Sequence, residues 1–70
     1  MGFQQRLYEL RKLSGLSQEG LASLLGVTRQ AVQKWESGSS RPDMDNLAAL
    51  ARYFNVSLDY LVTGQVRTAP

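Results

Sequence analysis

The sequence predicts an all-α fold, a compact five-helix bundle in a single domain. Apolar residues recur three and four positions apart along most of the chain, which is the spacing of one helix face. Good N-cap residues precede four of the predicted helices, and glycine or asparagine ends four of them. No segment alternates apolar and polar residues as a β-strand does. The domain is predicted over residues 1–64, with a frayed C-terminal tail over residues 65–70.

Two helices are predicted before residue 27. The apolar stripe of the first helix is formed by Phe3, Leu7 and Leu10. Gly15 supplies the left-handed residue that ends this helix, and Ser17 is suited to cap the next one. The inward stripe of the second helix consists of Leu21, Ala22 and Leu25. Gly20 lies inside this helix at a cost of about 1 kcal/mol relative to alanine, and close approach of another backbone is one candidate reason.

The third helix follows after a very short turn. Gly26 ends the second helix and Thr28 caps the third, so only residues 26–28 connect them. Such a connection fixes a sharp crossing, as in a helix-turn-helix. The third helix is predicted over residues 29–37 and stops at Gly38. Its inward side carries Ala31, Val32 and Trp35, and this spacing favours Trp35 as a core residue over one that stacks on a base.

Two more helices complete the predicted bundle. A polar loop leads to Asp43, which caps the fourth helix, and Asn55 ends that helix. The apolar stripe of the fourth helix is Met44, Leu47, Leu50, Ala51 and Phe54. Ser57 caps a short fifth helix, which contains Leu58, Leu61 and Val62. Leu24 and Tyr60 fall outside the stripes and are either single exposed apolar residues or part of a subunit contact.

The composition limits the classes of function. The chain has no cysteine or histidine, and it lacks a glycine-rich phosphate loop and a nucleophile elbow. We therefore expect no enzyme activity, no cofactor, no metal and no small-molecule ligand. Without cysteine, a signal peptide or an apolar run of membrane-spanning length, the sequence favours a cytoplasmic, nucleoid-associated protein with no membrane partner. The net charge is +2, and three cations accompany one acid between residues 29 and 41, so basic charge clusters near the third helix.

The outer face of the third helix carries the residue types that read base edges in a DNA major groove. Gln30, Gln33 and Lys34 share this face, and Arg29 lies beside Gln33. Glutamine can pair bidentately with adenine, and arginine or lysine with guanine. The alternative is a solvated polar face, which is the fate of most such faces. The short turn and the caps around it favour a recognition helix.

Residues near helix ends are candidates for DNA phosphate contacts, because unpaired N–H groups there favour anions. They are Ser17, Gln18, Thr28, Ser37, Ser39, Ser40 and Arg41. Ordinary N-capping also accounts for Ser17 and Thr28, whereas Gln18 is expected to be less needed by the fold. The serines after residue 36 fit a flexible loop and a phosphate contact equally well, and Arg41 favours a contact.

Glu36 is expected to be structural. A carboxylate in the last turn of a helix is disfavoured by the helix dipole, by up to about 1 kcal/mol. It also adds negative charge beside a surface meant for DNA. A cationic partner resolves both problems, and Arg11 on the first helix is the candidate. Their pairing would tie the first helix to the third.

With these residues in view, the chain resembles the lambda-repressor-like, Cro/XRE-type helix-turn-helix family. The matching segments are Leu16–Glu19 with Leu21–Ala22, Leu25–Thr28, Trp35–Gly38, Arg41–Pro42, Leu47 with Leu50–Ala51, and Val56–Asp59. The resemblance covers residues 3–64 and implies a five-helix domain that usually binds a palindromic DNA operator as a homodimer. It implies that the outer face of the third helix contacts bases and that Arg11–Glu36 is a family feature. The chain departs from the family at Gly20, where an acidic residue is usual, and in having a single cation in the loop after Gly38.

Two classes of function follow from these observations. The leading hypothesis is a sequence-specific transcriptional regulator that binds double-stranded DNA as a homodimer, acts as a repressor and places residues 29–37 in the major groove. The alternative is a protein-interaction module, such as an adaptor or antitoxin, that keeps the fold without reading bases. In that case Leu24, Tyr60 and the last helix would matter more than Gln30 or Lys34.

Overall fold

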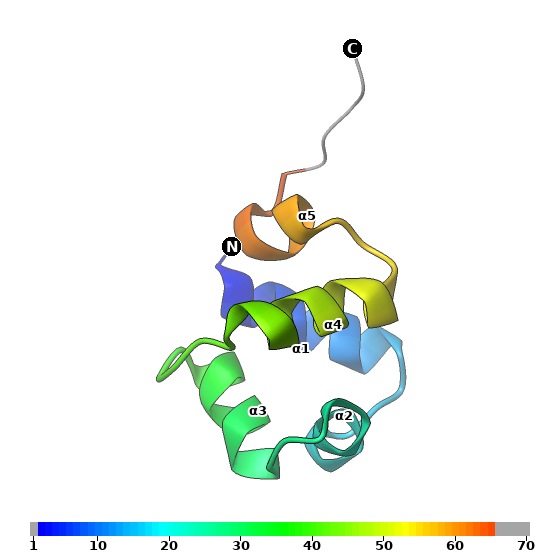
Figure 1. Cartoon of the computed structure of the whole chain (residues 1–70), viewed down its shortest axis with the longest axis vertical. Coiled ribbons are helices and arrows are strands. Elements are labelled where there is room, and N and C mark those ends of the chain that lie inside the picture. Colours follow the sequence, from blue (N-terminus) through cyan, green and yellow to red (C-terminus); the bar gives the residue numbers. More distant parts are fainter. Residues whose placement is uncertain (1, 66–70) are drawn as a thin grey trace.

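The computed structural model describes residues 2–65, which form five helices and no strand. The helices are α1 (Phe3–Leu13), α2 (Gln18–Leu25), α3 (Arg29–Ser37), α4 (Met44–Phe54) and α5 (Leu58–Thr63). Figure 1 shows α2 and α3 at the end of the molecule opposite α5, with α1 and α4 between them. The predicted all-α, five-helix architecture is therefore confirmed. Of the predicted frayed tail, residues 66–70 lie outside the described residues.

The helix boundaries follow from local hydrogen bonds made by the capping residues that the sequence predicts. The four predicted N-caps each accept a bond from the backbone N–H three residues on, at 2.9 to 3.2 Å; they are Ser17, Thr28, Asp43 and Ser57. Left-handed backbone is found at all four residues predicted to end helices, which are Gly15, Gly26, Gly38 and Asn55. These caps satisfy polar groups that a helix end otherwise leaves unpaired. These boundaries thus depend on bonds within a few residues of chain and not on contacts between helices.

The core lies where all five helices meet. α3 packs against both α1 and α2, α5 packs against α1 and α4, and α2 contacts α4. The side chains most completely removed from solvent are Leu7, Leu21, Val32, Leu50 and Leu61, one from each helix. Because each helix contributes to the same cluster, none can shift without opening the core. In the described range, no helix has the length and apolar character needed to cross a membrane.

One expectation about a single residue is wrong, and one candidate explanation is excluded. Met44 was placed on the inward stripe of α4, but it is 66% exposed, because it is the first residue of the helix and lies beyond the core. Gly20 is not approached by another backbone; a Cβ there would meet the Ser17 hydroxyl at 3.3 Å and the Leu16 side chain at 3.4 Å. Leu24 is exposed and Tyr60 is partly buried.

Candidate nucleic-acid interface

One side of α3 is fixed in the core and the other faces solvent. Val32 and Trp35 are buried, and Ala31 is partly buried between them. The four predicted base-reading residues, Arg29, Gln30, Gln33 and Lys34, are all exposed. Among residues 2–65, none of these four side chains has a hydrogen-bond or ion-pair partner. Their polar ends are therefore free to bind a ligand.

The turn between α2 and α3 sets the direction of this face. Gly26 takes a left-handed conformation (φ 71°), which lets the chain reverse within three residues. The N–H of Val27 then donates to the carbonyl of Ala22 at 3.0 Å, and Val27 packs against the core. Thr28 starts α3 at once by accepting from the Ala31 N–H. The short turn and the contacts between α2 and α3 fix the angle between the two helices, and they leave the polar side of α3 exposed.

Arg11 of α1 and Glu36 of α3 form the ion pair expected from the sequence. Arg11 Nε lies 2.6 Å from Glu36 Oε2, and Nη2 lies 3.0 Å from Oε1, so the contact is bidentate. Nη1 donates to the Leu16 carbonyl at 2.9 Å. The two side chains are only 9% and 6% exposed. The hydrogen bond to Glu36 raises the pKa of Arg11 above its usual value, although burial acts in the opposite direction.

Gln18 belongs to the same network. Its Nε2 donates to Glu36 Oε1 at 3.0 Å, so one carboxylate accepts from both Arg11 and Gln18. The expectation that the fold needs Gln18 less is therefore wrong. The charge pattern predicts Arg11 on α1 as the partner of Glu36, but nothing in the pattern indicates that α2 supplies a second partner. Three helices meet at this carboxylate, and it sets the position of the first turn of α2 relative to α3.

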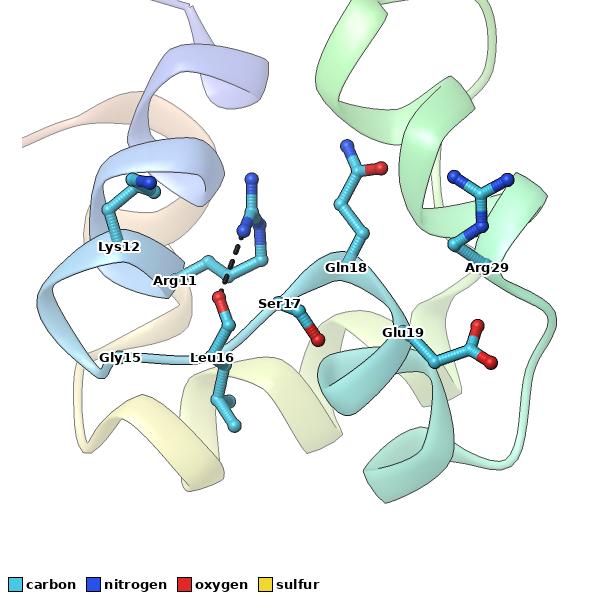
Figure 2. Close-up of a pocket in the computed structure, with 8 residues that line it drawn as sticks. All are labelled: Arg11, Lys12, Gly15, Leu16, Ser17, Gln18, Glu19 and Arg29. Atoms are coloured by element: carbon cyan, nitrogen blue, oxygen red, sulfur yellow. Dashed lines mark hydrogen bonds between the residues drawn. The ribbon is translucent and has the colours of Figure 1, made fainter.

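A hollow of about 620 Å³ opens beside this network, between the end of α1 and the starts of α2 and α3 (Figure 2). Its lining includes three cations, Arg11, Lys12 and Arg29, and one acid, Glu19. Figure 2 shows the side chains of Arg11, Gln18 and Arg29 directed to the same side, and marks the hydrogen bond from Arg11 to Leu16. Lys12 was not singled out from the sequence, because only the packing of α1 brings it to this place.

The loop after α3 is ordered by its own serines. The N–H groups of Ser39 and Ser40 both donate to the Lys34 carbonyl, at 3.0 and 3.3 Å. The hydroxyls of Ser37 and Ser39 lie 3.0 Å apart and bond to each other. These bonds order the loop internally, and the phosphate contacts of its serines stay a prediction. Arg41 is exposed, and its guanidinium carbon lies 5.8 Å from the centre of the Phe3 ring.

Arg6 is an important residue that the sequence reasoning missed. It is 4% exposed, and its Nε and Nη2 donate to the carbonyls of Leu61 and Val62 at 3.1 and 2.8 Å. These carbonyls lie in the last turn of α5, where a helix lacks internal partners. A signal was present: Arg6 lies three residues after Phe3, at the edge of the apolar stripe.

Comparison with known proteins identifies the family. A family profile described as helix-turn-helix matches residues 7–61, which is most of the chain and includes the α2–turn–α3 unit. The chain belongs to the Cro/XRE-type helix-turn-helix family. The match begins inside α1 and ends inside α5, so the family includes the helices that hold α3 in place as well as α3 itself.

Several relatives of this helix-turn-helix domain are regulators. Over 65 residues it is 42% identical to the HTH-type transcriptional activator BcrR of Enterococcus faecalis, covering 93% of this chain and 32% of that protein. It is 32% identical over 62 residues to repressor protein C2 of Salmonella phage P22, covering 89% of this chain and 29% of C2. The chain thus spans only about a third of the length of these relatives.

Two solved structures show the same fold. The P22 c2 repressor in complex with a synthetic operator superimposes with a TM-score of 0.87 at 31% identity, covering 93% of this chain and 98% of that one. The restriction-modification controller protein C.AhdI of Aeromonas hydrophila superimposes with a TM-score of 0.75 at 41% identity, covering 84% and 89% of the two chains. The predicted lambda-repressor-like fold is thereby confirmed.

Proposed function

We propose that this domain binds double-stranded DNA sequence-specifically and regulates transcription. The observation that carries the proposal is the division of α3 into a buried side, with Val32 and Trp35, and an outer side of exposed polar groups without partners. The operator complex of the structurally similar P22 c2 repressor supports it. As in other proteins with this motif, α3 would enter the major groove with its N-terminal turns nearest the bases.

The proposed base contacts follow from the chemistry of the outer face. Gln30 and Gln33 suit adenine, which offers N7 as an acceptor and N6 as a donor. Arg29 and Lys34 suit the two acceptors on guanine. Each good bidentate pair contributes about 1–3 kcal/mol of discrimination against a wrong base. We therefore infer a half-site that contains both adenine and guanine.

Phosphate contacts would flank the base-reading face. The proposed residues are Ser17, Gln18, Thr28, Ser37, Ser39, Ser40 and Arg41. Ser17, Gln18 and Thr28 lie at the N-termini of α2 and α3, where unpaired N–H groups attract anions. Because Gln18 Nε2 already donates one hydrogen to Glu36, it would contact a phosphate with its other hydrogen.

We further propose that the domain acts as a homodimer on a palindromic operator in the cytoplasm, associated with the nucleoid. Occupation of such an operator would change access of RNA polymerase to a promoter. The repressor C2 supports repression as the outcome, while the activator BcrR shows that a relative of this domain serves activation. Selection of bound sequences from a random duplex pool tests the homodimer, since a palindromic site reports two-fold symmetry and a single half-site would contradict it.

A binding assay that compares the selected site with a random-sequence duplex tests base readout directly. Gln30→Ala is expected to weaken binding to the selected site by about 1–3 kcal/mol, and to leave binding to random DNA nearly unchanged. Binding of the wild-type chain should fall with salt, with log K decreasing by about 0.9 per log unit of salt for each phosphate contact. Equal losses on both duplexes would refute base readout by Gln30. A flat salt response would favour the alternative, a protein-interaction module.

A further inference from the structure

The first turn of α1 contacts the loop that joins α3 to α4, far away in the sequence. The guanidinium carbon of Arg41 lies 5.8 Å from the centre of the Phe3 ring, within the range of a cation–π interaction. Phe3 is 2% exposed and belongs to the core, so its ring cannot turn away. The side-chain amide of Gln4 also approaches this loop, since a Cβ on Gly38 would lie 3.2 Å from it.

The backbone on both sides of Arg41 is held in place. Before it, the N–H groups of Ser39 and Ser40 donate to the Lys34 carbonyl. After it, Pro42 is buried and Asp43 caps α4 by accepting from the Asn46 N–H at 2.9 Å. The remaining freedom of Arg41 is therefore in its side chain, and the Phe3 ring restricts that freedom.

The charge of Arg41 remains available for an external anion. The side chain is exposed, and among residues 2–65 it has no ion-pair partner. A cation–π contact with a ring uses no N–H group of the guanidinium as a hydrogen-bond donor to a carboxylate, so these donors can still bind phosphate. An arginine that is already ordered loses less side-chain entropy when it binds.

We propose that Phe3 is a positioning residue for DNA binding, which holds the Arg41 guanidinium ready to contact a backbone phosphate. The inference rests on the proposed function, and it adds a residue of α1 that does not touch DNA itself. The ligand chemistry is the phosphodiester backbone of a duplex, independent of base sequence. Ordering this side chain beforehand removes part of the entropy cost of binding, which corresponds to about a twofold to fivefold change in affinity.

A double-mutant cycle on a random-sequence duplex at low salt tests the proposal. Phe3→Leu removes the ring but keeps an apolar side chain, and is expected to weaken binding by about twofold to fivefold. In an Arg41→Gln background the same substitution should have no further effect, because the interaction is already absent. Phe3→Tyr keeps the ring face and should bind like the wild type. Phe54→Leu serves as a control for loss of an aromatic residue that packs against the core, with folded protein quantified by circular dichroism.

A measurement on the unmodified chain covers the case in which Phe3→Leu fails to fold. The ring should shift the side-chain proton resonances of Arg41 upfield in the NMR spectrum, and random-coil values would overturn the proposal. Equal effects of Phe3→Leu with and without Arg41 would also overturn it, because they indicate a structural role alone. A wild-type chain that binds no duplex would refute the proposed function as well; binding without coupling refutes only the role of Phe3.

Discussion

Arg6 and Arg11 are both buried on α1, yet different groups accept their hydrogen bonds. Arg11 faces the carboxylate of Glu36 on α3, whereas Arg6 donates to main-chain carbonyls at the end of α5. In both cases a buried guanidinium meets an acceptor that needs a donor, either a charged side chain or the unpaired carbonyls of a helix terminus. One helix can therefore hold two others with the same type of residue, arginine, which binds a carboxylate in one case and main-chain carbonyls in the other.

The two contacts also hold different parts of the molecule. The Arg11 contact joins α1 to α3, the helix proposed to contact bases, and includes Gln18 of α2, so its loss should affect both stability and DNA binding. The Arg6 contact lies between α1 and α5, at the end of the molecule opposite α2 and α3 (Figure 1). Substitutions there should affect stability without changing the proposed interface.

The largest effect is expected from Glu36→Ala. It leaves the Arg11 guanidinium buried without its carboxylate, at a cost of about 3–5 kcal/mol in the free energy of unfolding. A domain of this size has about 3–5 kcal/mol in total, so about half or more of the variant should be unfolded at 25 °C by circular dichroism. The matched control combines Arg11→Met with Glu36→Leu, which removes both charges and should restore folding. If the double variant is as unfolded as Glu36→Ala, the unpaired charge is not the cause.

A smaller effect is expected from Arg6→Met, which keeps an apolar stem but removes the donors to Leu61 and Val62. The free energy of unfolding in urea should fall by about 1–3 kcal/mol, because two carbonyls lose a charged donor. Amide exchange should be accelerated most in α5. Arg52→Met on the exposed side of α4 is the control and should change stability by less than about 0.5 kcal/mol. A loss of DNA affinity by folded Arg6→Met would show that the two contacts are not independent.

The smallest effect is expected from Gln18→Ala. Glu36 keeps its two bonds to Arg11, and the vacated site is partly exposed, so the loss of stability should be about 1 kcal/mol in thermal unfolding. Gln33→Ala, an exposed residue with no partner among residues 2–65, should leave stability unchanged. No loss for Gln18→Ala would mean that its bond to Glu36 contributes nothing net, and that its role is confined to the DNA surface.

Of the two arginines, the sequence predicts the partner of Arg11 but not the partners of Arg6. Glu36 was recognised because a carboxylate at a helix C-terminus needs a cation, and Arg11 was the cation on the neighbouring helix. Arg6 was missed because its acceptors are main-chain carbonyls, which every residue has and which no side-chain pattern marks. The role of Gln18 was misjudged for a similar reason, since an amide fits a buried network and a phosphate equally well.

By itself, the sequence determined where α2 to α5 begin, where α1 to α4 end, and which side of α3 is polar. Capping hydrogen bonds join residues three positions apart, and residues that share a helix face are three or four positions apart. Both features therefore depend only on the local sequence. Only the tertiary structure decided that Arg6 reaches α5, that Gln18 shares Glu36 with Arg11, and that Met44 lies outside the core. These outcomes depend on which helix faces which, and that is settled only when the apolar faces of all five helices are packed together.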